Sequence, residues 1–353
     1  RTGGAAITIF SNGAAALAGL GAPLAGLGGR IDSLQFRTAD GAAMFSTDLT
    51  VMARRTGFPV ATVPRDRLIA HLAGDLPDGV VSFSSGIVTA TATDRAASVT
   101  DTTGAQHRAR VLVGADGHRS VVRRAILDGT PATECGWTTW QGLTLAPAEL
   151  ADLADGAVGI CVVGRSGLCG LMPAGGGLLQ WWFDVPGSGP EAGTMSPADW
   201  LRSQFAGYAA PVSDLLATVR DDQLESFPHV VHRVPSGWGT GAATLLGDAA
   251  HVFPPSQAQG ANQALEDAWL LSRALGKASG KDRDDIVPRL RRYEALRAPR
   301  VRRVSTMAAR ETTNKPPNPL TRTLARLVPA SVAGAAYTAL IKRLSSVLND
   351  EQL

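Results

Sequence analysis

A chain of 353 residues with 44% hydrophobic content is long enough for one large domain or two modest domains with a good core. Its formal net charge of +3, from 34 Lys and Arg against 31 Asp and Glu, is too small to indicate a nucleic-acid partner. The sequence has no signal-like start and no run of about 20 apolar residues. We therefore expect a cytoplasmic protein that acts away from the membrane.

Small residues dominate the first 13 positions, which permits close approach of the backbone to a ligand. A short helix is expected over 12–20. Further along, Asp40-Gly41 is a strong turn dipeptide between two strand-like runs, which predicts a hairpin over 31–39 and 43–45.

Residues 64–113 predict one helix followed by several strands. Pro64 can begin a helix because its fixed φ suits the first turn, and Arg65 then lies in that turn. The runs that follow are separated by the turns Asp94-Arg95 and Thr103-Gly104. The predicted strands cover 80–83, 86–93, 97–100 and 107–113.

Residues 111–123 join an apolar strand to a helix and read Val-Leu-Val-Gly-Ala-Asp-Gly-His-Arg-Ser-Val-Val-Arg. Asp116 stands at the end of the strand, where its carboxylate can fix loop amides or simply cap the helix that starts near His118. Arg123 offers a guanidinium fork that suits a phosphate.

The middle of the chain predicts a second, antiparallel sheet covered by two helices. Side chains of 178–184 alternate between two faces, so Leu178, Gln180 and Trp182 share one face. A plain strand with a core face and a surface face explains this alternation nearly as well as a ligand pocket does. The predicted strands cover 134–143, 158–163, 167–172 and 178–185, and the helices cover 197–205 and 211–220.

Cysteine and histidine spacing indicates no metal site. The three cysteines, Cys135, Cys161 and Cys169, lack the spacing of metal ligands. Cys161 and Cys169 are placed to pair across neighbouring strands, but reduced thiols are favoured in a cytosolic protein. His229 and His232 have no third ligand near them in sequence, so we reject a metal centre there as well.

The stretch 244–268 is the densest motif and reads Thr-Leu-Leu-Gly-Asp-Ala-Ala-His-Val-Phe-Pro-Pro-Ser-Gln-Ala-Gln-Gly-Ala-Asn-Gln-Ala-Leu-Glu-Asp-Ala. A buried strand (242–246) ends at Gly247-Asp248, and an amphipathic helix starts near Gly260 after a proline-rich loop. This geometry turns the first N–H groups of the helix toward a ligand, while Asp248 can accept hydrogen bonds from a sugar hydroxyl. His251 is expected to be a structural hydrogen-bonding residue. The alternative is an ordinary strand, loop and helix of an α/β protein.

A long helix follows and carries the sequence Tyr-Glu-Ala-Leu-Arg-Ala-Pro-Arg at 293–300. Its basic residues are Arg297, Arg300, Arg302 and Arg303. Because Glu294 and Glu311 are interleaved with these residues and no aromatic residue lies among the four arginines, the pattern favours a solvated face over a nucleic-acid site.

The segments 111–123, 244–268 and 293–300 together resemble the FAD-dependent aromatic hydroxylases, which are single-component flavin monooxygenases of the p-hydroxybenzoate hydroxylase fold. The resemblance implies an α/β fold in which a doubly wound, glutathione-reductase-like FAD-binding domain is interleaved with a mostly antiparallel β-sheet domain for substrate, followed by C-terminal helices. The implied FAD-binding domain comprises 1–27, 59–130 and 242–310, the substrate domain comprises 28–58 and 131–241, and the C-terminal helices lie in 311–353.

The same resemblance implies a site. Arg1 would lie near the phosphates and ribose of FAD, and the backbone at 260–262 would face the pyrimidine end of the flavin. A solvated Arg65 at a helix start is the alternative for that residue. No catalytic side chain is implied, because the flavin carries the chemistry. The implied cofactor-binding residues are Arg1, Arg65, Val88, Asp116, Asp248, Gly260, Ala261 and Asn262, and the implied substrate-binding residues are Leu178, Gln180, Trp182, Pro254 and Pro255.

Two departures from the family pattern stand out. The family's first FAD motif, Gly-x-Gly-x-x-Gly after the first strand, does not occur in the sequence. We expect a preceding segment to supply it, because every later cofactor motif is kept; a natural truncation that cannot hold FAD normally is the alternative. The second departure is Trp140-Gln141-Gly142, where the family has Trp-Arg-Gly.

The activity implied by the resemblance is FAD-dependent monooxygenation with NAD(P)H as co-substrate. Reduced flavin would react with O2 to a C4a-hydroperoxide, whose distal oxygen is transferred to an aromatic or polycyclic substrate such as a natural-product intermediate. A monomer or homodimer is expected. The alternative is a flavin-free, catalytically silent relative that binds a hydrophobic small molecule. A halogenase is less favoured, because its Trp-x-Trp-x-Ile-Pro pattern is absent from the sequence.

Overall fold

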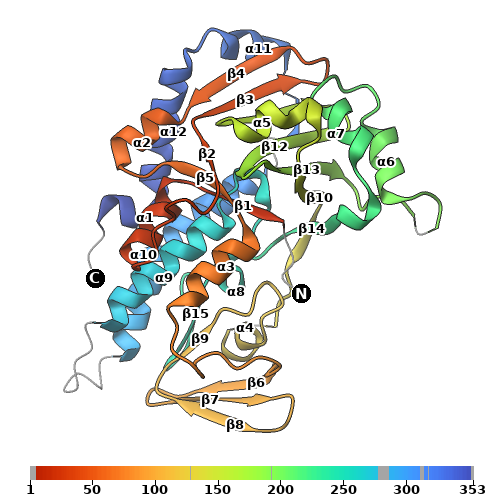
Figure 1. Ribbon diagram of the computed structural model, residues 1–353. Coiled ribbons are helices and arrows are strands. Elements are labelled where there is room, and N and C mark those ends of the chain that lie inside the picture. Colours follow the sequence, from red (N-terminus) through yellow and green to blue (C-terminus); the bar gives the residue numbers. More distant parts are fainter. Residues whose placement is uncertain are drawn as a thin grey trace.

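The computed structural model describes residues 5–127, 129–191, 193–276, 286–310, 314–316 and 318–350. Figure 1 shows a large sheet in the upper half, a group of long helices across the middle and a small sheet at the lower end. The mixed helices and sheets confirm the α/β class. How the chain divides into domains stays a prediction.

The large sheet has seven strands in the order β14-β10-β13-β12-β11-β3-β4. Neighbouring strands run antiparallel except β11 and β3, which are parallel. The sheet is therefore mostly antiparallel, and the hairpin around Asp40-Gly41 is confirmed as its edge. Its strands are β3 (Ser33–Thr38), β4 (Ala43–Asp48), β10 (Thr133–Leu145), β11 (Val158–Gly164), β12 (Gly167–Gly175), β13 (Leu178–Pro186) and β14 (Glu225–Val231).

One face of this sheet is covered by short helices. Trp181 and Phe183 of β13 are fully buried beneath them, and the ring of Phe183 packs edge-on against Phe205 with centroids 4.7 Å apart. Fully burying such a side chain contributes about 1.5–3 kcal/mol. The covering elements are η1 (Ala148–Leu150), α5 (Ala151–Asp155), α6 (Pro197–Gln204) and α7 (Val212–Thr218), and η2 (Asp221–Gln223) follows them.

A three-stranded antiparallel sheet lies beside the large sheet, in the order β1-β5-β2. Gly28 and Gly29 bring it close to β12, since a Cβ at Gly29 would lie 2.4 Å from the carbonyl oxygen of Pro173. Its strands are β1 (Ala6–Ile9), β2 (Gly29–Ile31) and β5 (Val60–Pro64), and the helices near it are α1 (Ser11–Gly19), α2 (Thr50–Thr56) and α3 (Arg65–Gly74).

The central helices enclose a parallel pair of strands, β15 (Ala243–Leu245) and β9 (Leu112–Gly114). Buried residues of α10 bind β15 directly: Tyr293 donates from Oη to the carbonyl of Leu245 (3.2 Å), and Glu294 accepts from Thr244 Oγ1 (2.6 Å). Burial raises the pKa of Tyr293 well above its usual value. The helices here are α4 (Val121–Ile126), α8 (Asp248–His251), α9 (Gly260–Gly276) and α10 (Ile286–Ala308), with η3 (Pro255–Gln257) between α8 and α9.

Helix α1 packs tightly on α9, and Gly13 permits the contact. A Cβ at Gly13 would lie 2.2 Å from Oδ1 of Asn262, which is far inside van der Waals contact. Only glycine fits there while Asn262 keeps its place.

Two strand predictions for the region of the small sheet at the lower end are wrong. Residues 80–83 lie outside any strand, and Phe83 is 86% exposed, because no neighbouring strand pairs with this run. The run 107–113 forms two strands rather than one, since the chain leaves the small sheet to enter the parallel pair. The strands are β6 (Ile87–Ala92), β7 (Ala97–Asp101) and β8 (Gln106–Ala109).

The chain ends on α11 (Pro319–Arg326), α12 (Ala330–Leu344) and η6 (Val347–Asn349). Among the described residues, no single helix has the length and apolar content to cross a membrane. Helices α11 and α12 have that length and apolar content only when they are counted together, and the pair is sharply bent. Cys161 and Cys169 are free thiols, as expected, rather than a disulfide across neighbouring strands. Burial raises the pKa of Cys161 to about 12.

Candidate functional site

The site is built at the end of β15. Gly247 follows this buried strand with φ +60° and ψ −140°, a conformation that favours glycine. Asp248 comes next, at the first position of α8, with an exposed side chain that bonds to no described residue. A free carboxylate thus stands at the carboxyl end of a parallel strand, the place where α/β folds bind ligands.

A buried carboxylate holds the turn at Gly247 in place. Asp267 Oδ2 accepts from the Gly247 N–H (3.0 Å) and from His251 Nε2 (2.6 Å), while Oδ1 accepts from Arg297 Nε (2.6 Å). Burial alone would raise the pKa of Asp267, but Arg297 and His251 lower it below its usual value. The structural role expected for His251 is therefore confirmed.

Arg297 extends this network to α1 and to the end of the chain. It pairs with Glu266 (3.2 Å) in addition to Asp267, and all three side chains are fully buried. Glu266 Oε1 also accepts from Asn12 Nδ2 of α1 (2.7 Å). Arg297 Nη1 donates to the hydroxyl of Ser346 (3.0 Å). One guanidinium thus connects α9, α10, α1 and the segment after α12.

The start of α9 is fixed by Asn262. Its Oδ1 accepts from the Phe10 N–H (2.9 Å), and its Nδ2 donates to the carbonyls of Thr8 (3.0 Å) and Ala258 (2.8 Å). The side chain therefore points back into the protein. The backbone N–H groups of residues 260–262 bond to no described residue, so they remain available to a ligand at the positive end of a 17-residue helix.

Strand β1 joins the start of α9 to the large sheet. Gln180 of β13 donates from Nε2 to the carbonyl of Ala6 (3.0 Å), while Asn262 of α9 holds Thr8 two residues further along β1. Gln180 is only 7% exposed, and its Oε1 has no partner in the described chain. A predicted substrate residue and the side chain of Asn262 at the start of α9 are thus both bound to the same four-residue strand.

The other predicted substrate residues lie on two different elements, β13 and the start of η3. Leu178 and Trp182 are half-buried and share the strand face of Gln180, and the Trp182 ring lies against Gly170. Pro254 is buried and Pro255 is half-buried at the start of η3.

The remaining predicted cofactor residues lie on different elements and do not all come together at the end of β15. Arg65 begins α3, where its half-buried side chain bonds to no described residue. Val88 is 52% exposed on the small sheet at the lower end (Figure 1). Asp116 caps α4, since its carboxylate accepts from the N–H of Val121 (2.7 Å) and Val122 (3.3 Å). Arg1 lies outside the described residues.

Two arginines differ from their sequence-based interpretations. Arg297 is fully buried rather than solvated, because it falls on the buried stripe of α10 with Leu290, Tyr293 and Val301. That helical spacing in the sequence was the available signal. Arg123 donates to the carbonyls of Ala249 (3.2 Å) and Ala250 (2.9 Å), so it binds the turn of α8 instead of presenting a free fork.

Comparison with known proteins gives consistent matches. A family model described as an FAD binding domain matches residues 37–308. The chain is 34% identical to 3-amino-4-hydroxybenzoate 2-monooxygenase PtmB3 of Streptomyces platensis, over 76% of this chain and 67% of that protein. It is 30% identical to the FAD-dependent urate hydroxylase of Klebsiella pneumoniae, over 85% of this chain and 77% of that protein. The crystal structure of Klebsiella pneumoniae HpxO with FAD and uric acid matches with a TM-score of 0.81 at 25% identity, covering 98% of this chain and 86% of that one.

Proposed function

The chain belongs to the family of FAD-dependent aromatic hydroxylases and monooxygenases, and on that premise we propose that it inserts one oxygen atom of O2 into an aromatic or polycyclic substrate with NAD(P)H as reductant. The observation that carries the proposal is the position of β1. This strand is bound on one side to the start of α9 and on the other to Gln180 of the large sheet. Cofactor and substrate would meet along it.

The described residues fit FAD. Asp248 is free to accept hydrogen bonds from the hydroxyl groups of the cofactor's sugar chain. The unpaired N–H groups at 260–262, at a helix start, would lie against the electron-rich edge of the ring and stabilise negative charge there. Bound FAD, once reduced, would supply the activation of O2 that no side chain can supply.

The protein itself would position the substrate and keep water away. Gln180 Oε1, buried and unpaired, would accept a hydrogen bond from a hydroxyl or N–H group of the substrate. Leu178 and Trp182 would offer apolar contacts on the same strand face. A water-free pocket strengthens each polar contact and limits side reactions with water.

The test is a combined measurement on the purified protein. We expect a flavin absorption spectrum, and we expect oxidation of NADH or NADPH with matching O2 consumption when phenols or polycyclic aromatic compounds are added. Mass spectrometry of the product should show a gain of one oxygen atom, labelled when 18O2 is used. A colourless protein that still binds hydrophobic compounds would instead identify a flavin-free binding protein.

Replacing Asp248 with alanine should weaken FAD binding by about 10- to 150-fold, because hydrogen bonds to a charged group contribute about 1.5–3 kcal/mol. Thermal stability should change little, since the side chain is exposed and unpaired. FAD affinity is measured by flavin fluorescence during titration of the apoprotein. Asp94→Ala, an exposed aspartate in the turn between β6 and β7, is the control. Unchanged FAD affinity in Asp248→Ala would contradict the assigned role.

A further inference from the structure

Helix α11 presents its apolar side to solvent. Leu320, Leu324 and Leu327, the residue that ends the helix, recur at helical spacing and are 70%, 56% and 75% exposed. The opposite side of the helix faces the protein, where Arg326 Nε donates to the carbonyl of Ala43 on β4 (2.7 Å). A surface helix of a globular protein usually turns its apolar stripe toward the core, so the orientation of α11 is the reverse of the usual one.

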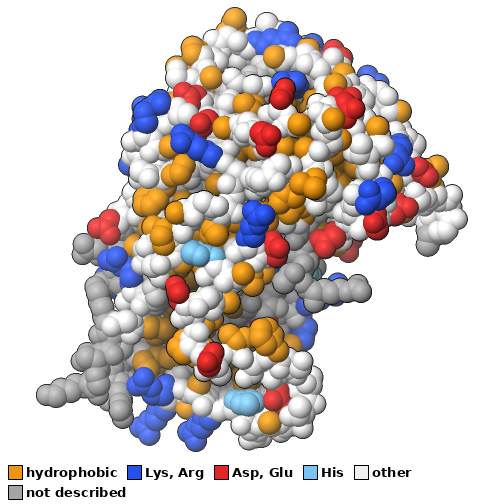
Figure 2. Space-filling model, viewed as in Figure 1, with side chains coloured by type: hydrophobic (Ala, Val, Ile, Leu, Met, Phe, Trp, Pro, Cys, Tyr) orange, Lys and Arg blue, Asp and Glu red, His pale blue; other side chains and the backbone are white. Residues whose placement is uncertain are grey.

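The exposed apolar side continues from α11 onto α12. Val328 and Val332 are 43% and 54% exposed, so one surface extends across the bend between the two helices. We call this surface the apolar face; it consists of Leu320, Leu324, Leu327, Val328 and Val332. Figure 2 shows hydrophobic and basic side chains side by side over α11 at the top of the molecule. Large exposed apolar patches mark sites of interaction.

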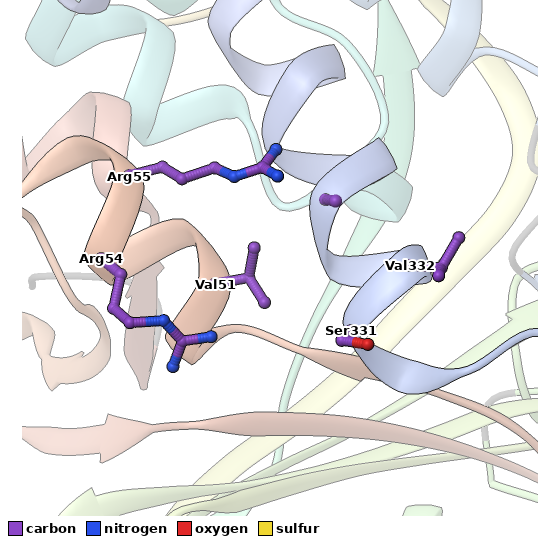
Figure 3. Close-up of a pocket in the computed structure, with 6 residues that line it drawn as sticks. Val51, Arg54, Arg55, Ser331 and Val332 are labelled. Carbon is purple, nitrogen blue, oxygen red and sulfur yellow. The ribbon is translucent and has the colours of Figure 1, made fainter.

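A cleft adjoins the apolar face between α12 and α2. This open cleft has a volume of about 480 Å³ and is lined by Val51, Arg54, Arg55, Ser331, Val332 and Ala335. Figure 3 shows Arg55 reaching from α2 toward α12, while Arg54 lies beside it on the same helix. Arg54 is 3.9 Å from Asp48, whereas Arg55 has no partner among the described residues. The cleft therefore combines an apolar interior with positive charge.

The charge of this region favours a negatively charged partner. Residues 314–349 contain five basic residues and no acidic residue. Asp48 lies near Arg54 and Asp40 lies near Arg322, while Arg55 and Arg326 add further positive charge to this region. An apolar helix side with basic neighbours is the pattern of a segment that lies in the interface of an anionic bilayer.

We propose that the apolar face and the arginines of α2 dock the protein onto an anionic lipid bilayer. The leucines of α11 enter the boundary between headgroups and acyl chains, and Arg54 and Arg55 contact lipid phosphates at the opening of the cleft. The expectation of a protein that acts away from the membrane rested on the lack of a spanning run, and such a run is not needed for docking of this kind. The proposal is independent of the assigned reaction.

The experiment is flotation of the purified protein with vesicles of phosphatidylcholine, with and without phosphatidylglycerol. We expect binding to the anionic vesicles and a several-fold loss of binding at high salt, because screening weakens the contribution of the arginines. The double variant L324E/L327E should bind at least about tenfold more weakly, since it removes two apolar insertions. Arg55→Ser should weaken binding roughly fivefold.

Matched controls lie at the other end of the molecule. Phe83→Glu changes an 86% exposed apolar residue, and Arg108→Ser removes an exposed charge on β8. Both should bind vesicles like the unmodified protein, and thermal unfolding checks that every variant is folded. The proposal is overturned if the unmodified protein floats with neither vesicle or if the controls lose as much binding. A dimer in light scattering that L324E/L327E converts to a monomer would overturn it too, by assigning the face to a second copy.

Discussion

Replacing Arg297 with methionine should lower the free energy of unfolding by about 3–5 kcal/mol, the usual result of removing one partner from a buried ion pair. The loss is large because Asp267 and Glu266 would both remain fully buried without their cation. Methionine fills much of the space of the arginine stem, so the effect reports the lost charge more than a cavity.

The same substitution should also affect the cofactor. Asp267 orients the Gly247 N–H and His251, which precede and follow Asp248. Without Arg297 the carboxylate of Asp267 is free to take up a proton and turn away, and the turn at Gly247 loses its support. We therefore expect weaker FAD binding at temperatures where the protein is still folded.

Chemical denaturation and flavin titration measure the two effects. Arg292→Met is the control, because Arg292 lies on the exposed side of the same helix and bonds to no described residue. That variant should unfold within about 0.5 kcal/mol of the unmodified protein. Equal stabilities of Arg297→Met and Arg292→Met would show that the buried network contributes no net stability.

Asn262→Ala is expected to have the second-largest effect. It removes three hydrogen bonds and leaves the N–H of Phe10 and the carbonyl of Thr8 without partners, at a cost of about 2–4 kcal/mol. Since these bonds hold β1 against the start of α9, the variant should also retain less FAD after gel filtration.

The conservative variant Asn262→Asp separates the two halves of this role. Aspartate can still accept from the Phe10 N–H, but its second oxygen would be a buried acceptor facing the carbonyls of Thr8 and Ala258, so this variant should be at least as unstable as Asn262→Ala. Asn349→Ala is the control, as the exposed Asn349 donates to two carbonyls near the end of the chain. An Asn262→Ala protein as stable as Asn349→Ala would contradict the proposed link between β1 and α9.

Local signals in the sequence predicted the elements that bear the site. The dipeptide Asp40-Gly41 indicated the edge hairpin, and the run up to Gly247-Asp248 indicated a strand that ends before a helix starting at Gly260. Each of these follows from residues that are neighbours in the chain: a turn that needs glycine, or an apolar stripe at helical spacing. The structure places all of them as expected.

The contacts between distant segments were not predictable in this way. Gln180 and Ala6 are 174 residues apart, and Asn262 and Thr8 are 254 apart, yet both pairs are needed to place β1. Nothing in a local pattern selects the partner of a buried amide. The burial of Arg297 was unpredictable for a related reason: basic residues are mostly exposed in proteins, and the two carboxylates that pair with this one lie on another helix.

The contact between Gly13 and Asn262 limits how this protein can be altered by laboratory evolution. Any side chain at position 13 collides with the amide of Asn262, and a smaller residue at position 262 releases β1. Neither position can therefore be relaxed by changing the other. In a randomised gene library, active clones should keep glycine at position 13 and asparagine at position 262, and efforts to alter the substrate range should start on β13, the strand proposed to contact substrate.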